Sequence, residues 1–345
     1  MAAVQIDLSP AFWHDQPAMR IAAIEVSHWH SLYDAAYLRI LSAMPDVHLV
    51  GLHDPNAAVA AKRAKELGEP PVFTDYRDML TKTKPDFVVA LGQHSRMAET
   101  ALYLLDQGYP FMMEKPMGVN AGEVSRIADK AALTQAFVAV AFPQRYSPFV
   151  ARARQMLAEG RFGPLSHLYF RLNRPTSARY TAWDSSWMLD PNLAGGGCLR
   201  NLGSHVLDLF LLLTGEDAKV TAAQLSARAL GQRVEDYASV LLRSTGGVLG
   251  TVEVGNTVPH AGSDSEWKIA GRDAILVHYH DDTMRLITAA GEETMSAKPA
   301  EALYPTAVRD IVDHWRRGLP PPVSVHDCLR VVRLIDQAYD LAASP

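Results

Sequence analysis

A lysine that follows an apolar run is the residue best suited to chemistry in this chain. Lys115 stands between Glu114 and Pro116, directly after the apolar residues 109–113. In open α/β sheets, ligands bind outside the carboxyl ends of the strands, so an ammonium group there could meet a substrate hydroxyl or a cofactor ribose. The alternative for so short a motif is a surface turn with a solvated charge.

A second group of chemically capable residues lies at 195–208, where three consecutive glycines precede an apolar segment. Asn201 and His205 are four positions apart, so in a helix they share one face and can point at one ligand. An imidazole can exchange a proton near neutral pH, and the amide can hold a hydroxyl or carbonyl group. The alternative for His205 is a buried helix histidine with its hydrogen bonds satisfied.

The elements that must position these residues alternate between strand and helix in the first half. We predict strands at 21–24, 47–52, 72–73, 87–91, 109–113 and 137–140, and helices at 32–44, 57–67, 97–106 and 121–133. This alternation favours a parallel sheet covered on both faces. It predicts an α/β, doubly wound, Rossmann-type dinucleotide-binding domain at 19–145, after an N-terminal extension at 1–18.

The second half changes character, which predicts an α+β domain at 146–345 for substrate binding and oligomerisation. After a helix at 149–160 we expect strands at 165–172, 220–227, 237–243, 248–254, 267–270, 275–280 and 283–288. Successive strands of this kind form a large, mostly antiparallel open sheet, one face of which could cover the active-site crevice. Two helices end the chain, and Ser324 with Asp327 resembles a capping box at the start of the last, 325–343.

The turn after the first strand departs from the usual dinucleotide fingerprint. A glycine-rich turn lets backbone N–H groups approach a pyrophosphate. Here Glu25, Val26, Ser27, His28, Trp29 and His30 follow instead. A carboxylate at Glu25 could repel phosphate unless it points away.

A carboxylate after the second strand keeps another dinucleotide marker. Asp54 occurs about where a ribose diol is held in NAD sites. No arginine follows closely to neutralise a 2′-phosphate, so NAD is favoured over NADP. The alternative for Asp54 is a turn residue or helix N-cap.

Composition limits the partners. The chain has 345 residues, a formal charge of -5 and a pI near 6.2. Without a basic surface, neither nucleic acid nor an anionic membrane is an expected partner, which favours small molecules. No apolar stretch reaches the roughly 18 residues needed to span a bilayer, and the N-terminus lacks a signal pattern, so we expect a cytoplasmic location. Cys198 and Cys328 give no disulfide framework.

The polar loop before the glycines offers groups for a carbohydrate. Tyr180, Trp183, Asp184 and Trp187 combine aromatic faces with a carboxylate, although packing between domains is an equal alternative for each tryptophan. Two histidine pairs, at 28/30 and 278/280, could share a strand face and ligate a metal. Because neither pair has a clear third ligand, we expect no metal site.

Taken together, these motifs resemble the glucose-fructose oxidoreductase / inositol dehydrogenase (Gfo/Idh/MocA) family. The strongest matches are residues 114–116 and 195–208, supported by 142–148, 161–164 and 318–324. The resemblance covers 19–343 and implies NAD(P) binding by the N-terminal domain. It also implies oxidation or reduction of a sugar, inositol or related polyol beneath the C-terminal sheet.

The resemblance also implies roles for individual residues. Lys115 would contact the nicotinamide ribose and the reacting hydroxyl, and His205 would act as the acid/base or orienting group. Asn201 stands where the family usually has aspartate, and an amide cannot accept a proton as a carboxylate does. The cofactor contacts expected are Ser27, His28, Trp29, His30, Asp54, Gln93, His94, Glu114, Lys115, Pro116 and Arg145. The substrate contacts expected are Tyr180, Trp183, Asp184, Trp187, Asn201 and His205.

Three functions fit these residues. The first is an NAD(H)-dependent dehydrogenase in which Lys115 and His205 manage the alcohol proton. The second is an enzyme that retains NAD and uses transient oxidation to cleave or eliminate a glycoside. The third is a non-catalytic relative that has lost its cofactor. By analogy with the family, we expect a homodimer or homotetramer.

Overall fold

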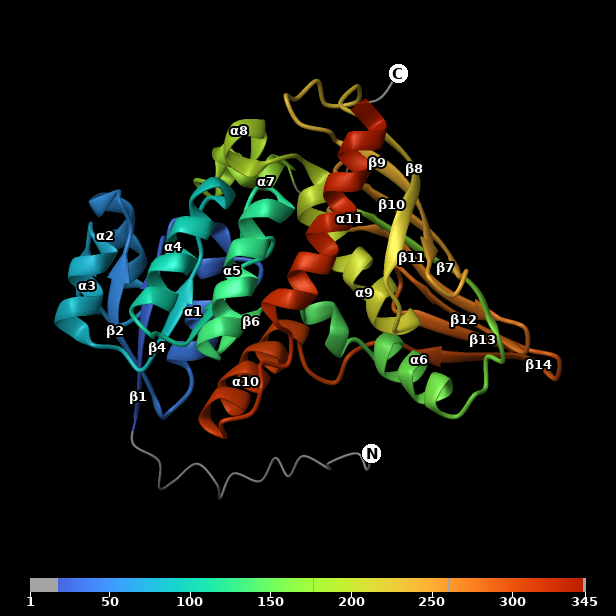
Figure 1. The fold of residues 1–345 in the computed structure, drawn as a ribbon, viewed down its shortest axis with the longest axis horizontal. Helices are drawn as coiled ribbons and strands as arrows, with labels where there is room; N and C mark the ends of the chain where they lie inside the picture. Colours follow the sequence, from blue (N-terminus) through green and yellow to red (C-terminus); the bar gives the residue numbers. More distant parts are fainter. Residues whose placement is uncertain (1–17, 176, 260, 344–345) are drawn as a thin grey trace.

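The computed structural model describes residues 18–343, apart from residues 176 and 260. A parallel sheet with its helices lies at one end of the molecule and a large sheet at the other, with the C-terminal helices between them (Figure 1). The predicted extension at 1–18 falls outside the described residues except for Ala18.

The first sheet has six parallel strands in the order β3-β2-β1-β4-β5-β6. They are β1 (Met19–Ile24), β2 (Val47–His53), β3 (Val72–Phe73), β4 (Phe87–Ala90), β5 (Phe111–Met113) and β6 (Val138–Val140). Strands β4, β5 and β6 are fully buried, as expected for apolar runs covered on both faces. The predicted doubly wound fold is confirmed. Its strand order reverses between β1 and β4, which opens a ligand crevice at their carboxyl ends.

Five helices accompany this sheet, and side-chain caps begin several of them. They are α1 (Tyr37–Ser42), α2 (Ala57–Lys65), α3 (Tyr76–Thr83), α4 (His94–Asp106) and α5 (Ala121–Thr134). The side chains of Asn56, Asp75 and Asn120 accept N–H groups in the first turns of α2, α3 and α5. Helix α3 was not predicted from the sequence.

The predicted helix at 32–44 is wrong over its first five residues. A short 3-10 turn, η2 (Trp29–Ser31), comes first, and α1 begins only at Tyr37. Asp34 and Ala36 have φ angles of 54° and 49°, in the left-handed region, which a right-handed helix cannot include. The chain therefore makes an irregular turn where a dinucleotide fold usually enters its first helix.

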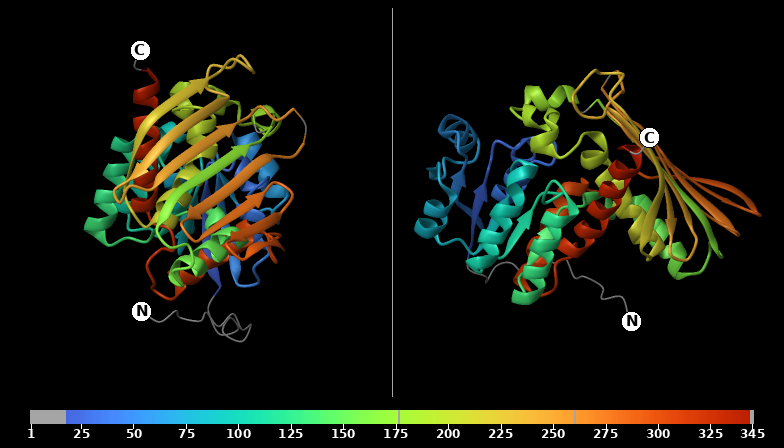
Figure 2. Two further views of the ribbon diagram at one scale, coloured as in Figure 1. Left: turned by 90° about the vertical axis from the view of Figure 1, so that its right-hand side faces the viewer. Right: turned by 45° about the horizontal axis from the view of Figure 1, so that its top comes forward.

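The second sheet has eight strands in the order β14-β13-β12-β11-β7-β10-β9-β8. They are β7 (Leu165–Asn173), β8 (Ala218–Ser226), β9 (Tyr237–Ser244), β10 (Leu249–Gly255), β11 (Asp264–Gly271), β12 (Ala274–Tyr279), β13 (Thr283–Thr288) and β14 (Gly291–Ser296). All neighbours are antiparallel except β7 and β10, which confirms the predicted open sheet. Strand β14 was not predicted. In the left panel of Figure 2, the broad outer face of this sheet carries no helix.

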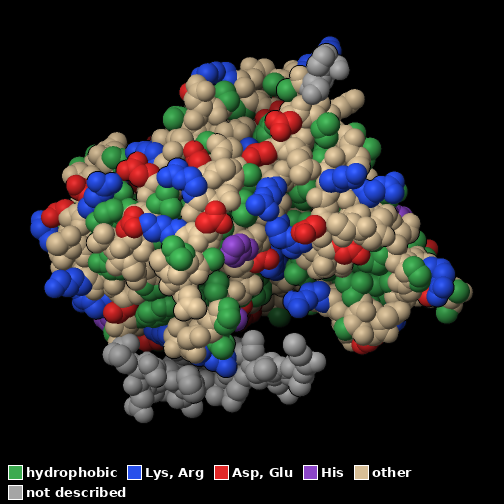
Figure 3. Space-filling model, in the orientation of Figure 1, with side chains coloured by type: hydrophobic (Ala, Val, Ile, Leu, Met, Phe, Trp, Pro, Cys, Tyr) green, Lys and Arg blue, Asp and Glu red, His purple; other side chains and the backbone are tan. Residues whose placement is uncertain are grey.

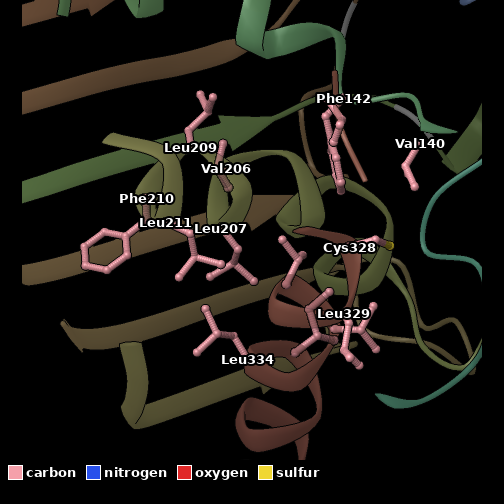
Figure 4. Close-up of a cluster of buried hydrophobic side chains, with 14 of the residues drawn as sticks. Val140, Phe142, Val206, Leu207, Leu209, Phe210, Leu211, Cys328, Leu329 and Leu334 are labelled. Carbon is pink, nitrogen blue, oxygen red and sulfur yellow. The ribbon is translucent and has the colours of Figure 1, made fainter. Parts of the chain in front are cut away.

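The inner face of the large sheet is covered by α6 (Pro148–Ala158), α9 (Ser204–Thr214) and α11 (Val325–Ala343) (Figure 1). Apolar side chains of α9, among them Val206 and Leu207, pack with Leu329 and Leu334 of α11 (Figure 4). Burial on nearly every side holds α9 between the sheet and α11. The residues that directly precede α9 are thereby held against the first sheet.

The C-terminal segment returns to the parallel sheet. Val140 of β6 donates its N–H to the carbonyl oxygen of Val323 at 3.0 Å. The predicted capping box follows, with Ser324 N–H to Asp327 Oδ2 at 2.8 Å and Asp327 N–H to Ser324 Oγ at 3.3 Å. Helix α10 (Leu303–Arg316) packs beside α1. The two sheets are therefore joined by contacts far apart in sequence.

The surface has no strong charge segregation on the face drawn in Figure 3, where acidic and basic side chains are interspersed. Among the described helices, none is both long and apolar enough to cross a membrane.

Candidate active site

Lys115 lies just beyond the carboxyl end of β5 and reaches into the second half of the chain. Its side chain is buried, and Nζ donates to the carbonyl oxygen of Asn201 at 2.8 Å and to Asn201 Oδ1 at 2.5 Å. An ammonium group has three N–H bonds. One therefore remains without a partner among the described residues and is available to a ligand oxygen.

Asn201 is held from both sides by hydrogen bonds. Its Oδ1 accepts from Lys115, and its Nδ2 donates to the hydroxyl oxygen of Tyr180 at 2.6 Å. Burial raises the pKa of Tyr180, which keeps its hydroxyl protonated. These contacts fix which side of the amide faces Lys115. The structure thus brings together Lys115, Asn201 and Tyr180, all three predicted as site residues.

His205 occupies the first turn of α9 and is buried. Its Nδ1 has no hydrogen-bond partner among the described residues. Burial, and then the charge of Lys115, lower the pKa of His205 well below its usual value, so the imidazole is neutral. Leaving a buried ring nitrogen without a partner costs free energy, which suggests that a ligand atom completes this contact.

Gly197, the last of the three consecutive glycines, allows the close approach of Glu235 from the segment between β8 and β9. Glu235 accepts the N–H of Gly197 at 2.8 Å and that of Leu199 at 2.9 Å, and also the hydroxyl of Tyr339 at 2.8 Å. A Cβ atom on Gly197 would lie 2.3 Å from the Glu235 carbonyl oxygen, so only glycine fits. Glu235 thereby anchors the π-helical turn η5 (Leu199–Gly203) that carries Asn201. Sequence reasoning missed Glu235, because its partners lie more than 35 residues away.

Glu114 neighbours Lys115 but is bound elsewhere. Its Oε1 accepts from His30 Nδ1 at 2.8 Å and from the hydroxyl of Tyr37. Although burial opposes ionisation, the charges of His30 and Lys115 hold the pKa of Glu114 below its usual value. Burial lowers the pKa of Lys115 to about 8, an effect that the Glu114 carboxylate partly offsets.

The turn after β1 uses most of its own N–H groups. Val26 N–H donates to His53 O at 3.0 Å, His28 N–H to Glu25 O at 3.2 Å and His30 N–H to His28 Nδ1 at 3.2 Å. The N–H of Ser27 donates to Asp54 Oδ2 at 2.7 Å. The cofactor contacts expected from Ser27, His28, Trp29 and His30 therefore remain predictions.

Asp54 is buried beside this turn, and each of its two carboxylate oxygens accepts one backbone N–H. Besides Ser27 N–H, it accepts Asn56 N–H at 3.0 Å through Oδ1. The N-cap of α2 is Asn56, so the N-cap alternative for Asp54 is wrong and the turn alternative holds. Each carboxylate oxygen can accept a further hydrogen bond. Ribose binding by Asp54 remains a prediction.

The loop at 177–194 lies against the first turn and is ordered by short helices. These are α7 (Ser177–Ala182), the 3-10 turn η4 (Ser186–Leu189) and α8 (Pro191–Ala194). Trp29, Tyr180, Met188 and Ala194 form one buried cluster, with Trp183 and Trp187 packed on it. Packing between the two halves therefore accounts for both loop tryptophans, and substrate contact by either remains a prediction.

The other residues predicted to contact cofactor or substrate have partners in several different elements. His94 Nδ1 donates to Ala194 O at 2.7 Å, and its ring meets Trp187 edge-on at 5.0 Å. Arg145 forms two hydrogen bonds with Asp208, at 2.8 and 2.5 Å, and one with Asp327 at 3.1 Å. Asp184 is exposed. The carbonyl oxygen of Pro116 accepts from Cys328 Sγ at 3.4 Å. Gln93 donates its backbone N–H to Glu25 Oε2 at 3.1 Å.

No group of three or more His, Cys, Asp or Glu side chains in the described part of the chain is arranged to hold a metal ion. In the first histidine pair, His30 binds Glu114. In the second, His278 packs against Phe149 and Trp267, with ring centroids 6.1 and 5.2 Å away.

Comparison with known proteins adds two family matches. Residues 31–142 match the family described as an oxidoreductase family with an NAD-binding Rossmann fold. Residues 150–277 match the GFO/IDH/MocA C-terminal domain.

Curated relatives include two kinds of dehydrogenase. The mouse trans-1,2-dihydrobenzene-1,2-diol dehydrogenase is 28% identical over 65% of this chain and 66% of its own length. The pig enzyme of the same name is 29% identical over 60% of this chain and 63% of its own length. The chain thus matches slightly less than two thirds of the length of these relatives. Levoglucosan dehydrogenase from Pseudarthrobacter phenanthrenivorans is 22% identical over 73% of this chain and 70% of its own length.

Solved structures share the whole fold. A levoglucosan dehydrogenase in complex with NADH and levoglucosan superposes with a TM-score of 0.82 at 21% identity, covering 94% of this chain and 97% of that one. GenD2 from gentamicin A biosynthesis, in complex with NAD, also has a TM-score of 0.82, at 20% identity, and covers 96% of both chains. At these identities the likeness is one of fold.

Proposed function

Because the chain belongs to the GFO/IDH/MocA family of oxidoreductases with an NAD-binding Rossmann fold, we propose that it is an NAD-dependent dehydrogenase. It would transfer hydride between nicotinamide and a CH–OH carbon of a sugar, inositol or related polyol. The family membership confirms the resemblance read from the motifs around Lys115 and His205.

One observation carries the proposal. Among the described residues, the buried Lys115 ammonium keeps an N–H bond without a partner, and the charge of Lys115 acts on His205, whose buried Nδ1 also has no partner there. A substrate hydroxyl is both donor and acceptor, so it can satisfy both groups at once. Contacts between the described residues satisfy neither the third N–H of Lys115 nor Nδ1 of His205.

The residues at the carboxyl edge of the parallel sheet fit a nicotinamide dinucleotide. Asp54 follows β2 and has spare acceptor capacity for ribose hydroxyls. Lys115 follows β5, and its remaining N–H can reach a ribose or substrate oxygen. When bound, NAD supplies the hydride acceptor. The fully buried Asp54 carboxylate would repel a 2′-phosphate, which favours NAD over NADP.

Proton transfer is the task of Lys115 in this proposal. Its pKa of about 8 lies near neutrality, and a general base works best when its pKa is near the operating pH. In the amine form Lys115 accepts the hydroxyl proton, and in the ammonium form it returns a proton to the carbonyl oxygen. Asn201, which carries no charge, holds Nζ in place, and neutral His205 orients the hydroxyl through Nδ1.

The relatives narrow the substrate class. Their names give a trans-diol of dihydrobenzene and the anhydrosugar levoglucosan as substrates, both of them ring compounds that carry hydroxyl groups. For this chain we infer a cyclic polyol or sugar. Tyr180 holds Asn201, and Trp183 and Trp187 pack on the cluster that contains Tyr180, so their aromatic faces would suit the ring CH groups of such a substrate.

The test begins with calorimetric titration of the cofactor-stripped protein with NAD⁺, NADH, NADP⁺ and NADPH. We expect micromolar binding of the NAD pair and weaker binding of the NADP pair. A screen of cyclic polyols and sugars at 340 nm then detects NADH formation. Failure of all four dinucleotides to bind would reject the dehydrogenase and favour a relative without a cofactor.

The same screen separates the NAD-retaining alternative. A dehydrogenase accumulates free NADH in proportion to the polyol consumed. An enzyme that cleaves or eliminates a glycoside through transient oxidation consumes substrate without net NADH. Substrate loss at constant absorbance at 340 nm would therefore favour that second function.

Self-association and location also remain proposals. The outer face of the large sheet exposes Leu241 and Leu249 at 45% and 47%, which supports the predicted homodimer or homotetramer. Light scattering that returned the 37.8 kDa monomer mass would reject it. The predicted cytoplasmic location awaits imaging of a tagged chain in its own cell.

A further inference from the structure

Glu25 directly follows β1 and has a backbone conformation that residues with a side chain rarely adopt. Its φ angle is 57°, in the left-handed region that favours glycine. Its side chain is only 9% exposed. A buried carboxylate in a strained turn needs specific partners, because neither feature is favourable on its own.

The partners of Glu25 come from the turn between β4 and α4 and from the first turn of α4. Its Oε2 accepts the backbone N–H of Gln93 at 3.1 Å, and its Oε1 lies 3.5 Å from Arg96 Nε. Gly92 makes room for this contact. Its φ angle is +109°, and a Cβ atom there would lie 2.5 Å from Glu25 Oε2. The carboxylate therefore rests directly on the β4–α4 backbone.

This position is the point where the sheet order reverses. Strands β1 and β4 are direct neighbours, with Ile24 paired to Ala90, and the chain leaves them on opposite sides. In open α/β folds, a ligand enters the crevice at this point. The Glu25 carboxylate thus occupies the part of the carboxyl edge that the dinucleotide must share.

The charges around Glu25 affect how a diphosphate would bind there. Arg96 is the cation paired with Glu25, and the carboxylate of Asp54 also lies close enough to raise the pKa of Glu25, after burial itself. A dinucleotide brings a diphosphate with two negative charges into the same crevice. Like charges at short range repel, and less strongly as salt rises.

We propose that Glu25 sets the dinucleotide affinity of this protein by competing with the cofactor's diphosphate for the Gln93 N–H and the Arg96 guanidinium. The inference rests on the proposed function. Each binding event must displace or neutralise the carboxylate, so the bound cofactor is held loosely. A loosely held NAD exchanges with solution, which suits a dehydrogenase that releases NADH and opposes the NAD-retaining alternative.

The test compares calorimetric dissociation constants of Glu25→Gln and the wild-type chain for NAD⁺ and NADH at low and high salt. The amide removes the charge, keeps the shape and can still accept Gln93 N–H. We expect about tenfold tighter binding of both forms at low salt, shrinking as salt rises. Arg96→Gln should weaken binding instead.

Controls keep the outcome interpretable. Glu99→Gln removes an exposed carboxylate from α4, the helix that carries Arg96. Glu99 pairs with Arg77, and its replacement should leave the affinity for NAD⁺ and NADH unchanged. Glu25→Gly relaxes the left-handed strain as well. A cooperative thermal transition of each cofactor-free variant would show that it folds.

The two hypotheses fail differently. If the wild-type chain binds NAD and Glu25→Gln binds it no more tightly, the role of Glu25 is wrong while the dehydrogenase stands. If no variant binds any dinucleotide, the proposed function fails and the role of Glu25 fails with it.

Discussion

Two regions of the carboxyl edge of the parallel sheet differ in what they leave available. Around Lys115 and His205, an ammonium N–H and an imidazole nitrogen have no partner within the described part of the chain. Around Glu25 and Asp54, the backbone N–H groups and the carboxylates are bound to one another. The first region has unfilled capacity for a ligand, whereas the backbone N–H groups of the second must exchange internal contacts for ligand contacts.

This difference shows that a fold can keep its reactive centre and still change how it holds a cofactor. The reactive region depends on long-range supports, notably Glu235 and Tyr180, that orient Asn201 and the turn that carries it. The turn after β1 is held by contacts within residues 25–31, by contacts to His53 and Asp54 at the end of β2 and by the contact of Glu25 with Gln93 after β4. Four substitutions test whether the two regions act separately.

The largest effect should come from removing the reactive amine. Lys115→Met keeps most of the buried aliphatic volume but removes the proton carrier, and it should lower turnover about a thousandfold. NAD affinity should change far less, because other groups hold the dinucleotide. Steady-state kinetics and calorimetry measure the two quantities. Lys82→Ala, at an exposed helix position, is the control, and full activity in Lys115→Met would refute the catalytic assignment.

A charge placed beside Lys115 should shift its titration. Asn201→Asp would favour the ammonium form, because an adjacent opposite charge raises the pKa of a lysine by about one to three units. Alcohol oxidation requires the amine, so its kcat/KM should rise with pH near 8 in the wild-type chain and only at higher pH in the variant. Asn201→Ala should lower activity without this alkaline shift. Identical pH profiles in the wild-type chain and Asn201→Asp would contradict the proposed role of Lys115 in proton transfer.

The support beneath the reactive region can be removed at Glu235. Glu235→Ala leaves the buried N–H groups of Gly197 and Leu199 without their acceptor, which should lower the free energy of unfolding by about 2 kcal/mol. Urea or thermal unfolding measures the loss. Glu235→Gln retains an acceptor and should lose less. An unchanged midpoint in the alanine variant would show that the glycine turn holds itself.

The smallest effect should appear at Asp54, in the region of internal contacts. Asp54→Ala removes the predicted ribose acceptor but frees Ser27 N–H, so NAD binding should weaken only about fivefold. NADP binding should weaken less, since the 2′-phosphate no longer meets a carboxylate. Titration of both dinucleotides measures the ratio. Equal affinities before and after the change would leave Asp54 with a turn role alone.

Local patterns were sufficient to predict most of the fold. The apolar runs that became β2, β3 and β4 began at the predicted residues, and the capping box at Ser324 marked the start of α11. Errors arose where local rules compete with tertiary contacts. Residues 32–36 have helical composition, yet Asp34 and Ala36 adopt left-handed angles beside the buried turn.

The residues of the candidate site also differ in whether local sequence or distant contacts determine them. Lys115, Asn201 and His205 could be proposed from residue type and spacing, because Lys115 follows an apolar run and Asn201 and His205 lie four positions apart after three glycines. The direction of the Glu25 side chain could not, since it depends on Gly92, Gln93 and Arg96, all more than 60 residues away.

The sequence by itself determined the alternating strands and helices, the lysine beyond β5 and the glycine turn before α9. These features follow from side-chain period, backbone freedom and neighbouring residues alone. Only the tertiary structure decided that Asn201 bridges Lys115 and Tyr180, that Glu235 anchors the glycine turn and that Glu25 rests on the β4–α4 backbone. Such contacts join distant segments, and their geometry is set by how the two sheets and α11 pack together.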